Sequence, residues 1–278
     1  MGRSPLVSVV MTTYDSERHV REAAESILAQ DLADLELIVV DDGSTDRTLA
    51  ILEGIPDKRL RILRIPRCGR IPSLNHGFRA ARAAYVANQD ADDVSLPHRL
   101  RAEVEALERN PGWAMVGAAE VPLIDEEGRP LGTRTRPTDP GHLRRALAYS
   151  MPFFHSSCLY RKSAWEEAGG FDESLALLED YDLWVRLAAR HDVANLPGAL
   201  GRKRRHAGQA FDGMHWTNQG YRTRARILRR YFRLVRRDPR VLVRAAAYQV
   251  MTPGLRVAWM RATHRDPTEL EVRKALRR

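Results

Sequence analysis

Cysteine is scarce in this chain, with only Cys68 and Cys158 among 278 residues. The two lie far apart in sequence and in no spacing typical of metal ligands, which argues against a disulfide scaffold and against a zinc cluster. No apolar run approaches the roughly 18 to 20 residues that cross a bilayer, and the first residues lack the pattern of a signal peptide. We therefore expect a cytoplasmic protein in a reducing compartment, without a membrane span.

Two common nucleotide-binding motifs are missing as well. The first apolar run is not followed by GxGxxG, and GxxxxGK[ST] occurs nowhere in the chain. No Asp-x-Asp follows that run directly, which argues against a phosphatase that works through an aspartyl-phosphate. A nucleotide site in this chain must therefore depend on acidic residues and a metal ion.

Charge is plentiful but unevenly distributed. The net charge is +9, yet residues 221–278 hold 17 Lys and Arg against 4 Asp and Glu, and the first 220 residues are mildly acidic. The acidic part is a poor nucleic-acid binder, whereas a basic tail can meet phosphates, anionic lipid or an acidic partner. We expect peripheral contact with the anionic inner face of the cell membrane through this tail, and not nucleic-acid binding.

Apolar runs and helical patterns alternate along the first half of the chain. The runs predict strands over 6–11, 35–40, 60–65 and 85–88, and the periodic segments predict helices over 17–30, 44–52 and 72–83. Further on, we expect a helix over 97–108, a strand over 114–118, a hairpin turn at 125–132, a strand over 156–160, helices from 162 and over 179–190, and a basic helical segment after 216. This alternation predicts an α/β fold with a mostly parallel sheet flanked by helices.

Polar clusters follow three of the predicted strands, at 12–15, 41–44 and 90–93. Because the strands are parallel, the three clusters should meet at one edge of the sheet, where ligands bind in such folds. The carboxylates in Asp90-Ala91-Asp92-Asp93 repel one another unless a cation lies among them, and Mg²⁺ or Mn²⁺ takes such ligands together with phosphate oxygens. A solvated acidic turn before a helix capped near Ser95 is the alternative.

Asp41 and Asp42 can accept hydrogen bonds from a nucleobase or from ribose hydroxyls, while Ser44 or Thr45 is as well suited to cap a helix. Glu179-Asp180 opens a helix with a strong packing face, where a carboxylate is fixed well enough to act as a general base. Complementation of the helix dipole alone is the alternative reading.

Two histidines have open roles. His155, beside apolar residues, can be a structural histidine or lie on the acceptor side of a site. His206 follows a basic run and can be a metal or phosphate ligand or simply end a basic strand.

Five segments in order resemble the family-2 glycosyltransferases, which are inverting, sugar-nucleotide-dependent enzymes of the GT-A fold. The segments are VSVVMTTYDSE, ELIVVDDGSTDRT, NHGFRAARAAYV, DADDVSLPHRL and LLEDYDLWVRLA. The resemblance implies a Rossmann-like GT-A domain over 1–215, with a nucleotide-sugar half over about 1–118 and an acceptor half over about 119–215, followed by a basic helical extension over 216–278. Asn88 and Gln89 depart from the family pattern, in which apolar or aromatic residues precede the acidic motif.

The resemblance also implies roles for individual residues. The implied donor contacts are Thr12, Tyr14, Asp41, Asp42, Arg70, Asn75, Asp90 and Asp92, with Gly69 in the same loop. Asp42 is expected to contact the base, and the acid pair of the DxD motif is expected to position the ribose and a divalent metal, Mn²⁺ or Mg²⁺. The expected metal ligands are Asp92, Asp93 and His206. Asp180 matches the family's catalytic base, with Glu179 and His155 on the acceptor side.

The implied reaction moves a sugar from a nucleoside-diphosphate sugar, with UDP as the expected nucleotide, to a hydroxyl of a glycan or lipid-linked acceptor. It would serve polysaccharide, glycolipid or glycoconjugate biosynthesis in the cell envelope. A catalytically degenerate sugar-nucleotide-binding protein and a nucleotidyltransferase are the alternatives. Intact acids at 42, 90, 92 and 180 argue against the first, and the absence of a basic, glycine-rich N-terminal loop argues against the second.

Overall fold

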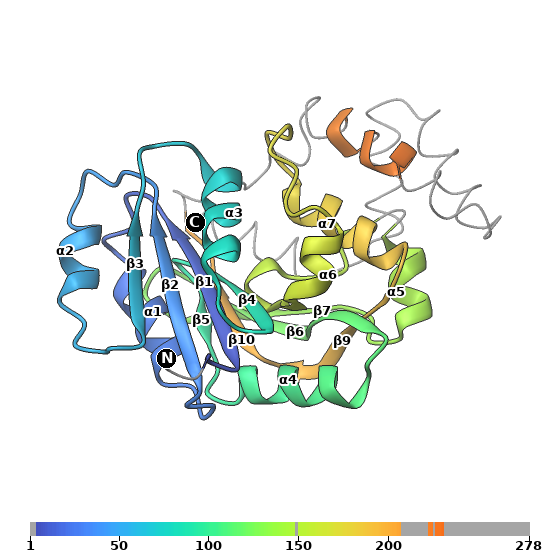
Figure 1. The fold of residues 1–278 in the computed structure, drawn as a ribbon. Helices are drawn as coiled ribbons and strands as arrows, with labels where there is room; N and C mark the ends of the chain where they lie inside the picture. The colour runs from blue at the N-terminus through green and yellow to red at the C-terminus, as the bar shows by residue number, and fades with distance from the viewer. Residues whose placement is uncertain (1–3, 148–149, 207–221, 225, 231–278) are drawn as a thin grey trace.

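A single mixed sheet runs through the protein. The computed structural model describes residues 4–147, 150–206, 222–224 and 226–230. Within them ten strands join in the order β3-β2-β1-β4-β8-β6-β10-β5, with β7 and β9 also paired to β6 (Figure 1). The strands are β1 (Val7–Thr13), β2 (Leu35–Asp41), β3 (Leu60–Arg64), β4 (Tyr85–Asp90), β5 (Val94–Ser95), β6 (Trp113–Ile124), β7 (Pro130–Thr135), β8 (Leu159–Arg161), β9 (Asp192–Ala199) and β10 (Gly201–Arg204).

The first four strands of this order are parallel to one another, as predicted. Their register sets Thr12 at the end of β1 beside Asp90 at the end of β4, and Thr13 beside Asp41 of β2. The polar clusters therefore meet at one edge of the sheet. Strand β8 then runs antiparallel to both β4 and β6, which makes the sheet mixed beyond β4.

Helices cover both faces of the sheet because successive strand residues point to opposite sides. Val9 on β1 packs in a core with α1 (Val20–Leu28), α2 (Thr48–Glu53) and α4 (Arg99–Arg109). Its neighbour Val10 packs on the other face, in a second core with α3 (Arg70–Ala80), α5 (Pro140–Ala146), α6 (Lys162–Glu167) and α7 (Glu179–Ala188). The predicted flanked sheet is confirmed.

Several predicted boundaries were wrong for local reasons. Helix α2 begins at Thr48, because Ser44 and Thr45 bond to Asp15 and cap no helix. Ser95 lies in β5 and donates to Gln89 Oε1 at 2.8 Å instead of capping the next helix.

The strand predicted over 156–160 shortens to β8, because residues 155–157 form a 3₁₀ turn. Strands β5 and β9 were not predicted, and β10 was considered only as a basic strand that ends near His206. Two of them, β9 and β10, run parallel to β6, and β10 also pairs with β5.

The predicted division of the chain falls partly outside the described residues. Strand β6 crosses the boundary predicted near residue 118, so the two predicted halves share one sheet. Most of the basic extension predicted over 216–278 lies outside the described residues, although Ile227 and Leu228 are buried in the core beside α7. Among the described residues, no helix has the length and apolarity to cross a membrane.

The contact between α3 and the sheet can be tested at Gly77. A methyl group at this position would overlap Val10 Cγ1 and lie 3.1 Å from Val40 Cγ2. We expect Gly77→Ala to lower the free energy of unfolding by about 1 to 3 kcal/mol, because the core has no room for the added carbon. The measurement is the midpoint of urea unfolding. Gly112→Ala is the control, since nothing lies within 4 Å of that position, and equal midpoints for the two variants would contradict this packing.

Candidate active site

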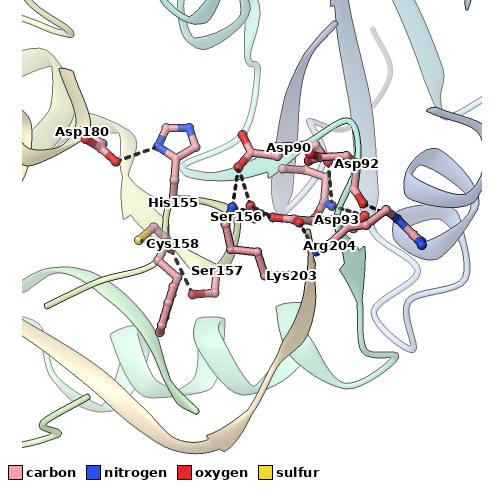
Figure 2. A network of polar contacts seen from close by, with 12 residues as sticks. Asp90, Asp92, Asp93, His155, Ser156, Ser157, Cys158, Asp180, Lys203 and Arg204 are labelled. Atoms are coloured by element: carbon pink, nitrogen blue, oxygen red, sulfur yellow. Dashed lines mark hydrogen bonds and ion pairs between the residues drawn. The ribbon is translucent and has the colours of Figure 1, made fainter. Parts of the chain in front are cut away.

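Three carboxylates from β4 and the turn after it lie together at the edge of the sheet (Figure 2). Asp90, Asp92 and Asp93 each offer an oxygen within 4.8 Å of the others. Such a cluster is stable only if positive charge is close by. Two cationic side chains from distant parts of the chain lie beside it.

Arg70, at the start of α3, is the first cation. Its Nη2 donates to Asp90 Oδ1 at 2.7 Å, and its Nε donates to Glu179 Oε1 at 3.0 Å. Lys203 on β10 is the second, with its Nζ 3.7 Å from Asp90 Oδ2 and 3.4 Å from Asp93 Oδ2. Burial disfavours the charged form of Asp90, but Arg70, His155 and Lys203 outweigh it and hold the pKa of Asp90 well below its usual range.

Asp93 is buried, and its carboxylate contacts neighbouring protein groups. It is 2% exposed, and its Oδ1 accepts a hydrogen bond from the backbone N–H of Arg204 at 2.8 Å. Its Oδ2 contacts Lys203 and the hydroxyl of Ser156, which also donates to Asp90 Oδ2 at 2.7 Å. Burial, together with the charges of Asp92 and Asp90, raises the pKa of Asp93 to about 7.

Asp92 has a different neighbour, the imidazole of His206. The two side chains meet at 3.0 Å between Nε2 and Oδ2. Carboxylate oxygens suit Mg²⁺ and Mn²⁺, and an added imidazole nitrogen favours the transition metal Mn²⁺ over Mg²⁺. The residues at this edge therefore fit the divalent metal expected from the sequence, with Asp92 and His206 on the open side of the cluster and Asp93 behind it.

A second acidic group lies where β2 ends. Asp42 is 3% exposed, and its carboxylate accepts hydrogen bonds from the backbone N–H of Cys68 at 2.7 Å and of Gly69 at 3.0 Å. Arg67 donates to Asp42 Oδ2 at 2.7 Å, and its guanidinium lies 3.3 Å from the centre of the Tyr14 ring. Tyr14 is 41% exposed. An aromatic face beside an acid and a guanidinium provides stacking and hydrogen-bonding groups for a planar base.

Three other predicted donor residues, Thr12, Asp41 and Asn75, are buried as well. Asp41 is 1% exposed and accepts from the Ser44 N–H at 3.1 Å, while Thr12 lies at the end of β1. The Asn75 amide is engaged with Phe171, accepting from its N–H at 3.0 Å and donating to its carbonyl at 2.9 Å. Contacts of these three residues with a donor stay predictions.

The carboxylate of Asp180 lies in the first turn of α7, next in sequence to Glu179. Leu178, the residue before this helix, has a φ of 66°, which turns the chain sharply into α7. The Tyr181 N–H donates to Asp180 Oδ1 at 2.6 Å, and His155 Nδ1 lies 3.9 Å from Asp180 Oδ2. Burial and the charge of Glu179 raise the pKa of Asp180 to about 7. A carboxylate with this pKa can accept a proton at neutral pH and release it again.

Sequence reasoning missed four residues of the site, namely Arg67, Ser156, Lys203 and Arg204. Arg67 precedes a glycine turn, which was the only local signal. Lys203 and Arg204 belong to a basic run that looks solvent-exposed in the sequence, although Arg204 is 1% exposed.

The fold is an α/β sheet flanked by helices, with the acidic motif at one edge of the sheet and the Asp180 carboxylate in the first turn of α7. Residues 8–169 match the family described as Glycosyl transferase family 2. The chain is 36% identical over 194 residues to a putative glycosyltransferase, EpsE, of Bacillus subtilis, with 67% of this chain and 68% of EpsE covered. The chain therefore belongs to glycosyl transferase family 2.

Another relative is the amylovoran biosynthesis glycosyltransferase AmsE of Erwinia amylovora. It is 29% identical over 201 residues, which cover 70% of this chain and 74% of AmsE.

Solved structures agree on the fold. TarS 1–349 of S. aureus, solved with UDP-GlcNAc, superposes with a TM-score of 0.67 at 20% identity, covering 81% of this chain and 66% of that TarS chain. The mannosyltransferase PcManGT of Pyrobaculum calidifontis, solved with GDP-Man and Mn²⁺, has a TM-score of 0.60 at 20% identity and covers 99% and 80% of the two chains. The GT-A fold expected from the sequence is confirmed.

The raised pKa of Asp180 predicts a pH-dependent cost to stability. Between the ordinary value of 3.8 and about 7, the folded protein keeps a proton that the unfolded chain has lost, so stability falls as pH rises through this interval. The Asp180→Asn variant has no carboxyl group at this position, so it does not lose stability for this reason as the pH rises. We expect the melting temperature of this variant, relative to the unmodified protein, to increase from pH 5 to pH 8.

Differential scanning calorimetry at a series of pH values measures this difference. Glu108→Gln, which removes an exposed carboxylate on α4, is the control for loss of one negative charge. A difference for Asp180→Asn that does not change with pH would contradict a raised pKa.

Proposed function

We propose that this protein is an inverting glycosyltransferase that moves a sugar from a UDP-sugar to a hydroxyl acceptor, with Asp180 as general base. The observation that carries the proposal is that two carboxylates with different pKa values lie close together. Asp90, paired with Arg70, holds its negative charge firmly, whereas Asp180 has a pKa of about 7. Arg70 also contacts Glu179, beside Asp180, so the two sites are neighbours.

The donor lies along the sheet edge in this proposal. Tyr14 stacks on the base, Asp42 and Arg67 bond its edge, and Asp90 contacts the ribose. Asp92 and His206 would hold a divalent metal, with Asp93 as their support, and the ion would neutralise negative charge on the diphosphate. The nucleotide-sugar complexes of TarS and PcManGT, one of which contains Mn²⁺, support a donor of this class.

Asp180 performs the proton transfer. Its Oδ2 accepts the proton of an acceptor hydroxyl while the hydroxyl oxygen forms a bond to the anomeric carbon. The bond between that carbon and the diphosphate breaks on the opposite face, and its electron pair leaves with the nucleoside diphosphate. A single displacement of this kind inverts the anomeric centre. Because Oδ1 is held by the Tyr181 N–H, the other oxygen remains for the acceptor.

The acceptor we propose is a glycan or a lipid-linked glycan in the biosynthesis of a polysaccharide or related cell-envelope glycoconjugate, on the cytoplasmic side of the membrane. The name of the relative AmsE, an amylovoran biosynthesis enzyme, supports this assignment.

Two variants test the proposal, one that loses the general base and one that loses a predicted metal ligand. Asp180→Asn should slow release of UDP from UDP-sugars by about 10²- to 10⁴-fold, because the general base is lost, yet leave UDP binding intact. His206→Gln should keep the base but lose the strengthening of UDP binding by Mn²⁺. Release is measured on a panel of UDP-sugars with water and oligosaccharides as acceptors, and UDP binding by calorimetry with and without Mn²⁺.

His76→Gln, an exposed histidine on α3, is the matched control and should change neither quantity. Undiminished UDP release by Asp180→Asn would overturn the assignment of the base. Tight UDP binding by the unmodified protein without any turnover would favour a degenerate binding protein. Pyrophosphate release from UTP and a sugar 1-phosphate, tested in a separate reaction, would favour a nucleotidyltransferase.

The basic residues after 220 lead to a separate part of the proposal, that the full chain docks on anionic membrane near its acceptor. We expect the protein to sediment with vesicles of phosphatidylcholine and phosphatidylglycerol at low salt and to dissociate at high salt, because Lys and Arg bind the anionic headgroups. Vesicles of phosphatidylcholine alone are the control. Equal binding to both vesicle types, or none to either, would refute electrostatic docking.

A further inference from the structure

The 3₁₀ turn at His155–Ser157 joins the two chemical sites (Figure 2). Ser156, in the middle of the turn, donates to Asp90 on the donor side. His155, the residue before it, faces Asp180 on the acceptor side. The turn is tied down at its start and its end, since the Ser157 N–H donates to the Phe154 carbonyl at 3.0 Å and the Asn88 N–H donates to the Cys158 carbonyl at 3.0 Å.

His155 has an unusual environment for a structural histidine. The residue is 9% exposed, and its Nδ1 is buried without a hydrogen-bond partner. The ring nitrogen of a buried histidine is normally paired, because an unpaired polar atom loses its bonds to water without replacement. The carboxylate oxygen that faces this nitrogen is Oδ2 of Asp180, at 3.9 Å, which is slightly beyond a hydrogen bond.

The remaining charged groups around the pair are already engaged. Arg70 donates to Asp90 and Glu179, and Lys203 contacts Asp90 and Asp93. The Asp180 carboxylate receives only the Tyr181 N–H at Oδ1 among the hydrogen bonds of the described residues. His155 is therefore the side chain placed to orient Oδ2.

We propose that His155 is the positioning residue of the catalytic base, donating its Nδ1–H to Asp180 Oδ2 in the working enzyme and leaving the second lone pair of that oxygen for the acceptor hydroxyl. This inference rests on the proposed function. It requires a closure of about 1 Å, from 3.9 Å to hydrogen-bond length. The same turn then fixes the base through His155 and the donor-side carboxylate through Ser156, so the two sites keep a constant separation.

Two substitutions separate this role from packing. His155→Phe keeps a ring beside Phe171, whose ring centre lies 6.4 Å from that of His155, but removes the donor. His155→Asn keeps a donor, because its amide nitrogen can occupy the position of Nδ1. We expect His155→Phe to lower kcat for UDP release by roughly 10- to 100-fold without changing KM for the UDP-sugar. His155→Asn should stay within about threefold of the unmodified enzyme, since it restores the hydrogen bond.

The pH profile gives a readout that packing would not change. Loss of an N–H donor disfavours the charged carboxylate, so the acid limb of kcat should move to higher pH in His155→Phe and stay in place in His155→Asn. Both variants are compared at equal folded fraction, set by their melting temperatures. An unchanged kcat and pH profile in His155→Phe, or equal losses in the two variants, would overturn the inference.

The Asp180→Asn background distinguishes failure of this inference from failure of the proposed function. There His155→Phe should cause no further loss, because the carboxylate it positions is gone. If Asp180→Asn is itself fully active, the proposed function fails. If Asp180→Asn is inactive but His155→Phe is normal, the proposed function stands and only the role of His155 is refuted.

Discussion

Repulsion among carboxylates at one edge of the sheet is the constraint to which the rest of the structure responds. The acids that gather there are Asp90, Asp92, Asp93, Glu179 and Asp180. Their cationic partners come from far away in sequence: Arg70 is 109 residues from Glu179, and Lys203 is 110 residues from Asp93. The site thus exists only in the folded protein, and α3 and β10 are as necessary to it as the acids themselves.

A buried layer beneath the acidic motif holds it in place and explains a departure from the family pattern. Arg99 on α4 is fully buried, pairs with Glu103, and donates to the side chain of Gln89 and the carbonyl of Asn88. A buried guanidinium needs all its donors satisfied. The polar side chain of Gln89 directly before the motif therefore meets a requirement set by Arg99, where an apolar residue would leave a donor unpaired.

The elements and site residues that could be predicted from the sequence depend on local patterns. Those that could not depend on contacts between residues far apart in the sequence. The apolar runs of β1, β2 and β4 were sufficient to place Asp42, Asp90 and their neighbours at one edge. The same reasoning could not separate Asp41, which points into the fold, from Asp42, which meets Arg67, because adjacent residues at a strand end differ only in the side they face. Strand β10 is a basic run whose structure comes from pairing with β6 and β5, so Lys203 carried no local signal.

The two principal acids of the site have pKa values shifted in opposite directions. Asp90 and Asp180 are both removed from water, which by itself raises the pKa of each. Arg70 and Lys203 contact Asp90 and keep it charged, whereas Asp180 has Glu179 beside it and its pKa remains near 7. Two carboxylates of the same type are thereby separated into a permanent anion and a group that can exchange protons at neutral pH. Arg70 donates directly to Asp90 and Glu179, whereas at Asp180 its charge lowers the pKa by less than burial and Glu179 raise it.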